Sequence, residues 1–318
     1  MRRSLGMEIR GRTKGRLLAS LLCVPLAGAT SVLATLKQSD SLEAGRRAYE
    51  SSDYSKAVLE LQERDAAITS AERAVAIDPK SSVYHEWLGR AYGEKADHSS
   101  MFSALGLARK THREFEVAVE LDEKNFPARQ ALIEYYCEAP GIVGGGEEKA
   151  KPEIEKLQAM DASEGHFAAG ICRKQKKEFV AADAEFKLAL ESHPKRADLI
   201  YDIGDYAMRH GHAEQLMQVA ELGAQIAPSD PRGMFYRAVG LILENEKPEA
   251  AEKFLREYLQ KAPKRAEYPR YAAAHEWLGR LYENKGDKKS AEKEYQAALQ
   301  LDPKDKSVRE SLRRVEKN

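Results

Sequence analysis

The 318-residue chain has little β-forming sequence, no net charge and three cysteines. Valine and isoleucine are sparse, and no alternation of apolar and polar residues persists long enough to predict strands. Hydrophobic residues make up 42% and charged residues 32%, so the chain is too apolar for a disordered protein. Because Ala, Leu, Glu and Lys are abundant and all favour helix, the composition predicts an all-α soluble protein.

The charge is unevenly distributed along the chain. Residues 1–29 hold six Arg or Lys against Glu8, which leaves the remainder with 45 basic and 50 acidic residues. A mildly acidic body argues against a nucleic-acid partner, which would need a basic face. The basic stretch precedes an apolar run that ends in Ala27-Gly28-Ala29, the order of a secretory signal peptide. Residues 1–29 therefore predict export to the periplasm or another extracytoplasmic compartment.

Two other interpretations of the N-terminus remain open. Residues 17–36 carry no charge and are just long enough to span a bilayer as an uncleaved anchor. A retained anchor would also suit a membrane-tethered structural protein whose stack oligomerises. The last interpretation is a cytoplasmic protein with an unusual N-terminus.

Internal repetition is the strongest pattern in the sequence. The segment His85–Tyr92 recurs as His275–Tyr282 with seven of eight residues unchanged. Glycine, alanine and proline also recur with gaps of 19 and 5 residues, and Gly170 and Gly204 lie 34 residues apart. The two complete sets are Gly170, Ala189 and Pro194, and Gly279, Ala298 and Pro303. This period, with these residue types, resembles the tetratricopeptide repeat family, of a bacterial exported type.

The resemblance implies an all-α, right-handed superhelical solenoid of about seven antiparallel helix pairs. Its concave groove would bind a peptide or partner protein, which makes the chain an interaction scaffold of the bacterial envelope rather than an enzyme. The repeats are expected at 41–81, 82–125, 126–162, 163–196, 197–230, 231–264 and 272–305, within a domain of 41–305. Residues 306–318 are expected to form a C-terminal capping helix.

The first two repeats are longer than the others. The distances from Gly45 to Ala74 and from Gly89 to Ala118 are both 29 residues, so each repeat carries a ten-residue insertion. Residues 58–77 and 102–121 are therefore expected to form long helices. Beyond residue 29 two cysteines remain, Cys137 and Cys172, in the predicted first helices of neighbouring repeats. An exported protein can oxidise such a pair, but two separate buried apolar side chains are the favoured interpretation.

The sequence offers few candidates for chemistry. His85-Glu86 and His275-Glu276 begin like a zinc-protease helix, but glycine stands where the second histidine is needed. No phosphate-binding loop or nucleophile elbow is present, and His210-Gly211-His212 is expected to be a turn. We therefore expect no catalytic residue, metal or cofactor. The alternative is a subunit or regulator of an envelope enzyme, with a site in residues 94–121 at Asp97, His98 and His112.

Candidate partner contacts lie at fixed offsets from the repeat glycines, on the predicted groove side of the first helices. The apolar candidates are Phe167, Ile171, Tyr201, Met208, Phe235, Val239 and Ile242. The charged candidates are Glu86, Arg90, Glu276 and Arg280. Packing between neighbouring helices is the alternative for each. The loop glycines Gly144, Gly145 and Gly146 are either a flexible connection or a partner contact, because Glu147 and Glu148 would repel a bound anion.

Overall fold

The computed structural model describes residues 57–265 and 267–317, with side chains from residue 63. This part of the chain is helical and contains no strand, which confirms the predicted all-α fold. The elements in chain order are α2 (Ala57–Ile77), α3 (Ser82–Asp97), α4 (Met101–Leu121), α5 (Phe126–Glu138), the 3₁₀ turn η2 (Gly141–Val143), α6 (Glu147–Met160), α7 (Ala162–Gln175), α8 (Phe179–Glu191), α9 (Ala197–His210), α10 (Ala213–Ile226), α11 (Arg232–Glu244), α12 (Pro248–Lys261), α13 (Tyr271–Asn284), α14 (Lys288–Leu301) and α15 (Lys306–Lys317). The predicted signal peptide or anchor and the start of the first repeat lie outside the described residues.

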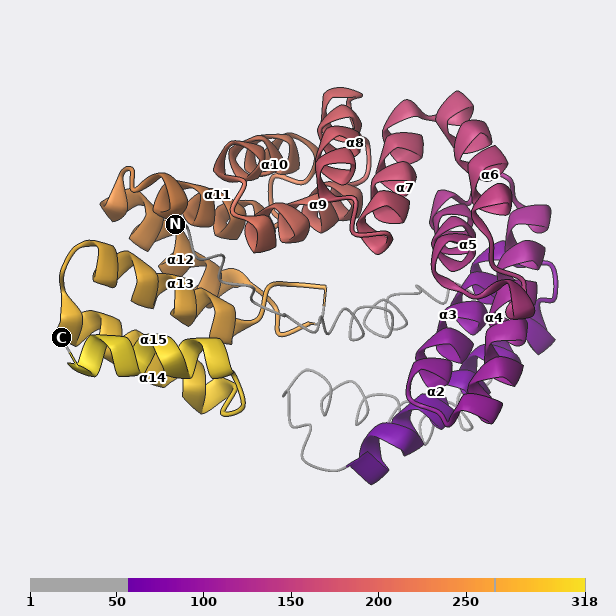
Figure 1. Ribbon diagram of the computed structural model, residues 1–318, viewed down its shortest axis with the longest axis horizontal. Coiled ribbons are helices and arrows are strands. Elements are labelled where there is room, and N and C mark those ends of the chain that lie inside the picture. Colours follow the sequence, from indigo (N-terminus) through magenta and orange to yellow (C-terminus); the bar gives the residue numbers. More distant parts are fainter. Residues whose placement is uncertain (1–56, 266, 318) are drawn as a thin grey trace, which may run out of the picture.

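The helices follow one another in antiparallel pairs along a curved path (Figure 1). In that view α2 to α5 lie on one side, α6 to α10 cross the top, and α11 to α15 complete the other side. Consecutive first helices (α3, α5, α7, α9, α11 and α13) contact one another along the whole stack. A comparable contact between consecutive second helices is made by α8 and α10. The first helices therefore approach each other more closely and lie toward the concave side.

The repeat glycines set the distance between the two helices of a pair. A Cβ atom at these positions would lie 2.5–2.6 Å from an aromatic ring of the second helix, closer than any side chain tolerates. The pairs are Gly89 with Phe115, Gly170 with Phe186, and Gly279 with Tyr295. The rings are buried, so each glycine lets a large apolar side chain fill the space between the helices.

The predicted long helices at 58–77 and 102–121 are α2 and α4, which have 21 residues each. The second helices from α8 to α14 have 13 or 14 residues. At the other end of the stack, α15 packs on α14 through Val308 and Val315, and Arg314 pairs with Glu283 of α13 at 2.7 Å. The outer face of α15 is polar, as expected of a helix that covers an open-ended stack.

Candidate partner-binding surface

Five of the apolar residues predicted to line the groove are buried instead. Phe167, Tyr201, Phe235, Val239 and Ile242 all belong to the largest hydrophobic cluster of the described chain, and none is more than 6% exposed. They pack between neighbouring helices, so the prediction that they contact a partner is wrong for these five. Ile171 and Met208 are partly buried at the edge of the same cluster and remain accessible.

Tyr201 shows why the groove prediction failed. The guanidinium of Arg232, from the next first helix, lies 4.3 Å from the centre of the Tyr201 ring and 4.9 Å from that of Tyr268. Arg232 is held there by bonds to Asp230 and by Asp198 at 2.9 Å. A side chain that belongs to the following repeat therefore covers the ring.

The duplicated segments His85–Tyr92 and His275–Tyr282 form the same arrangement of side chains near both ends of the stack. Arg90 Nε donates to Glu86 at 2.9 Å, and an Arg280 guanidinium nitrogen donates to Glu276 at 2.6 Å. Each arginine also lies over the tryptophan of its own helix, at 5.7 Å for Trp87 and 4.4 Å for Trp277. Glu86 is buried, whereas Arg90, Glu276 and Arg280 are partly accessible. The predicted charged pairs are therefore internal ion pairs with an accessible arginine.

A second repeated contact joins the first and second helices of three pairs. A histidine four residues before the repeat glycine bonds a glutamate four residues before the repeat alanine, at 2.6–2.8 Å. The pairs are His85 with Glu114, His166 with Glu185, and His275 with Glu294. The three glutamates are not among the residues predicted from the sequence, although their fixed spacing from the alanines was a usable signal. The contacts explain the repeated His as a link between helices.

A row of polar residues links the starts of four consecutive first helices. Gln130, Glu164, Asp198 and Arg232 lie 34 residues apart, at one position of the repeat. Gln130 bonds Glu164, Arg232 bonds Asp198, and Arg196 bonds both Gln130 and Glu164 at 2.6–2.9 Å. This row ties adjacent repeats together near the groove, and the 34-residue spacing was visible in the sequence.

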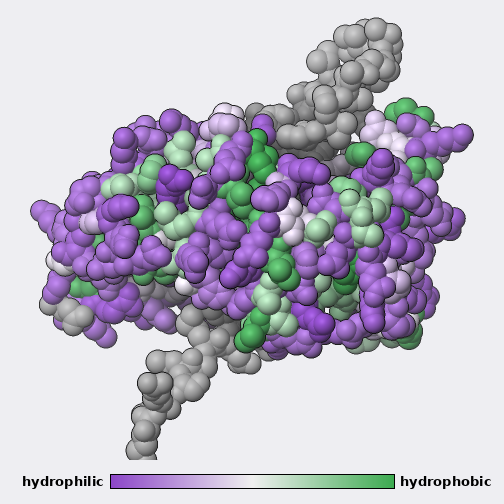
Figure 2. All heavy atoms as spheres, turned by 90° about the horizontal axis from the view of Figure 1, so that it is seen from above, coloured by the Kyte–Doolittle hydropathy of each residue, from purple (hydrophilic) through white to green (hydrophobic). Residues whose placement is uncertain are grey.

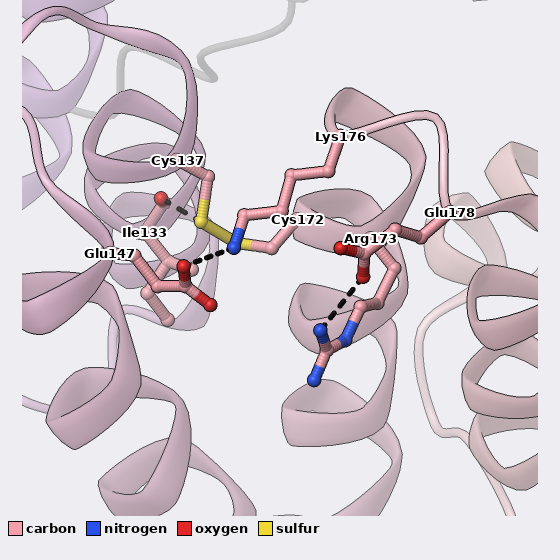
Figure 3. The surroundings of a disulfide bond; sticks show 7 residues. All are labelled: Ile133, Cys137, Glu147, Cys172, Arg173, Lys176 and Glu178. Carbon is pink, nitrogen blue, oxygen red and sulfur yellow. Dashed lines mark hydrogen bonds and ion pairs between the residues drawn. A yellow bond between two sulfur atoms is a disulfide. The ribbon is translucent and has the colours of Figure 1, made fainter.

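Cys137 and Cys172 form a disulfide between α5 and α7 (Figure 3). The favoured interpretation of two separate buried thiols is therefore wrong, although the expected approach of the two first helices is correct. Lys176 and Glu147 form an ion pair beside the disulfide, between the end of α7 and the start of α6. Repeat three has Tyr136 at the position where repeats two, four, five and seven have Gly89, Gly170, Gly204 and Gly279. Its first helix is held to the next one by a covalent link in addition to packing.

The loop between α5 and α6 packs against the long helix α4. Tyr135 donates to the carbonyl of Val143 at 2.7 Å, and burial raises the pKa of Tyr135 to about 12, so the hydroxyl stays a donor. His112 of α4 stacks on the Tyr135 ring, with centres 5.1 Å apart, and burial lowers the pKa of His112. The loop is thus placed by specific contacts.

The three loop glycines serve the backbone path of that loop. Gly144 and Gly146 have φ values of 101° and 147°, which other residues rarely adopt. The N–H groups of all three donate to carbonyls of the same segment, at Gly141, Pro140 and Tyr136. An anion site would need those N–H groups to be free, so the geometry argues against one here.

The enzyme alternative finds no support in the placement of its candidates. His98 Nδ1 bonds the carbonyl of Glu94 at the end of α3, whereas His112 contacts Tyr135 and Tyr136 of α5. Asp97 is exposed. Within residues 57–265 and 267–317, no three His, Cys, Asp or Glu side chains are placed to hold a metal ion. Among the helices of the same part of the chain, none is long and apolar enough to cross a membrane.

Antiparallel helix pairs stacked with their first helices side by side define an α-solenoid. Within that class, residues 272–305, which include nearly all of α13 and α14, match the family model of the tetratricopeptide repeat. The match thus identifies α13 and α14 as similar to one tetratricopeptide repeat, and the preceding helices stack in the same antiparallel order. Comparison with curated proteins found no match.

Two solved structures are similar to this chain over most of its length. One is a tetratricopeptide repeat protein from Parabacteroides merdae ATCC 43184, with 15% identity, a TM-score of 0.43, and coverage of 87% of this chain and 99% of that one. The other is the TPR domain of P58(IPK), with 15% identity, a TM-score of 0.35, and coverage of 89% and 67%.

Proposed function

We propose that this protein is an interaction scaffold outside the cytoplasm, which holds a peptide or partner protein along the first-helix face. Tetratricopeptide repeats generally mediate contacts between proteins, and this match carries the proposal. The first helices form one continuous row from α3 to α13. A continuous row of side-by-side helices offers an extended surface that suits a long partner segment.

The accessible part of that face combines apolar and cationic side chains. Ile171 and Met208 are partly exposed between the charged pairs at the two ends, where Arg90 and Arg280 are also partly exposed. A partner segment with apolar anchors and flanking carboxylates fits this distribution. Both arginines already have a carboxylate partner within this chain. They would therefore orient a bound partner segment but add little to its affinity.

The proposal is tested by affinity capture of the exported chain with Ile171→Gln and Met208→Gln combined. These side chains are partly exposed, so the substitutions remove apolar contact area with a small effect on folding. Leu188→Gln is the matched control, because Leu188 is an exposed apolar residue of the second helix α8. We expect the groove variant to lose partners that the control variant keeps. Retention of every partner by both variants would refute binding at this face.

Location outside the cytoplasm is supported by two features. Residues 1–29 have the order of a signal peptide, and the Cys137–Cys172 disulfide suits an oxidising compartment. Mass measurement of the mature N-terminus separates a cleaved signal from a retained anchor. A full-length chain with both thiols reduced in the cell would contradict the proposed location.

A further inference from the structure

The turn between α3 and α4, together with the first turn of α4, forms a tip at residues 98–104. Two large apolar side chains are exposed at this tip. Met101 is 76% exposed and Phe102 is 87% exposed, at the first turn of α4. Residues 98–108 contain no Asp, Glu, Lys or Arg, the longest such run after residue 36 in a chain with 32% charged residues. This tip lies within the ten-residue insertion of the second repeat, which the packing of the repeat does not require.

Basic side chains follow the apolar tip along the same helix. Arg109, Lys110 and Arg113 are all exposed, and Arg109 lies about 12 Å along the helix axis from Met101. Lys110 also lies over the ring of Tyr92, 4.8 Å from its centre. Asp97 is the nearest exposed carboxylate in the sequence. The apolar side chains at the start of α4 and the cations about two turns later have the spacing of two layers of a lipid bilayer. Apolar side chains suit the acyl chains, and cations suit the phosphate groups above them.

The first residue of α2 lies at the same end of the molecule as this tip. Helices α2 and α3 are antiparallel, since Asp65 pairs with Lys95 at 2.5 Å and Glu72 accepts from Tyr92 at 2.7 Å. The start of α2 therefore lies beside the end of α3 and the start of α4. Residues 17–36 carry no charge, and the twenty residues 37–56 that follow them can extend at most about 70 Å.

We propose that the Met101–Phe102 tip inserts into the surface of a lipid bilayer. The exposed Phe and Met side chains enter the acyl boundary, while Arg109 and Arg113 stay at the level of the headgroups. This contact goes beyond the proposed scaffold function and does not depend on partner binding. It orients the stack with the α3–α4 tip toward the membrane and the far end of α2 away from it.

Tryptophan quenching in the full chain tests the contact. Phe102→Trp places a reporter at the tip, and Ile77→Trp is the matched control. Ile77 is 83% exposed at the opposite end of α2, beside the end of α4, where Ser82 donates to the carbonyl of Ala118 at 2.6 Å. The native residues Trp87 and Trp277 give a background that is measured in the unsubstituted chain. Vesicles of phosphatidylcholine with brominated acyl chains serve as the quencher.

We expect the Phe102→Trp emission to shift to shorter wavelength and lose intensity on brominated vesicles, with no change at position 77. Equal quenching at both positions, or none at position 102, would overturn the proposal. Protection of position 102 from iodide before vesicles are added would also overturn it, since the chain itself or a second copy would then cover the tip.

A second measurement keeps the test independent of the reporter. Hydrogen exchange in residues 101–108 should slow on vesicles in the unsubstituted chain and in Ile77→Ser. The combined variant Met101→Ser and Phe102→Ser should lose that protection. Protection that persists in the combined variant would show that lipid contact at the tip is not made by these side chains.

Discussion

At the residue scale, the space beside each repeat glycine determines whether a helix pair can close. A Cβ atom at Gly170 would lie 2.6 Å from the buried ring of Phe186. We expect Gly170→Ala to lower the free energy of unfolding by about 1–3 kcal/mol, because the ring must move or the helices must separate. Urea unfolding followed by circular dichroism measures the change.

Gly106 provides the matched control for that prediction. It lies inside α4, where a Cβ atom would meet nothing within 4 Å. Gly106→Ala should therefore raise the free energy of unfolding by about 0.5–1 kcal/mol, since alanine restricts the unfolded chain more than glycine does. If both variants were more stable than the unsubstituted chain, helix propensity rather than the fit beside the glycine would be the controlling factor.

The buried Glu294 makes a pH-dependent contribution to stability. Burial alone would raise its pKa, but bonds from His275 at 2.7 Å and Arg256 at 2.7 Å outweigh burial and lower the pKa. A folded-state pKa below the unfolded value stabilises the folded state above the unfolded pKa, and this stability is lost as the pH falls through the folded pKa. We expect Glu294→Gln to cost about 1–3 kcal/mol at neutral pH.

The same substitution should cost much less once the carboxylate of the unsubstituted chain is protonated. Unfolding midpoints at neutral pH and in acid, below the folded pKa of Glu294, give the two differences. A cost that does not depend on pH would mean that Glu294 acts through packing and neutral hydrogen bonds alone.

At the element scale, the disulfide joins α5, which has Tyr136 in place of the repeat glycine, to α7 of the next repeat. It closes a loop with a sequence separation of 35 residues. Its removal in Cys137→Ser should therefore destabilise the chain by about 2–4 kcal/mol. We expect hydrogen exchange to rise most in α5, η2 and α6, whose contacts the disulfide supports.

Reductant provides the control for the disulfide. Treatment of the unsubstituted chain should reproduce the exchange pattern of Cys137→Ser, whereas reductant added to that variant should change nothing in α5 to α7. If exchange in α13 and α14 rose as much as in α5, the disulfide would be stabilising the whole stack rather than one junction.

The positions of the helices were predicted well from the sequence. The contacts between helices of neighbouring repeats were predicted less well. The bounds of α4 followed from the spacing of Gly89 and Ala118, because both residues act within one helix pair. The burial of Tyr201 depended on Arg232, which comes from the next repeat, and on the curvature that brings them together. The disulfide depended in the same way on the approach of α5 and α7. Local periodicity does not encode these contacts between repeats.

At the scale of the whole molecule, the described surface is mainly hydrophilic, with hydrophobic residues in narrow bands on the face shown in Figure 2. In the described part of the chain, each helix pair packs mainly against its neighbours along the path. The stability of such a stack is close to a sum of repeat terms and junction terms. The polar row from Gln130 to Arg232 strengthens the central junctions, since it continues through four repeats.

The duplicated segment allows the additivity of repeat and junction stabilities to be tested with the same substitution at two places. Gly89→Ala would bring a Cβ atom to 2.6 Å from Phe115, and Gly279→Ala would bring one to 2.5 Å from Tyr295. We expect hydrogen exchange to rise in α3 and α4 for the first variant and in α13 to α15 for the second. The central helices α7 to α11 should change little in either, because the damage must cross several junctions to reach them. Exchange that rose throughout the chain in both variants would instead require one cooperative unit and would contradict the additive stack.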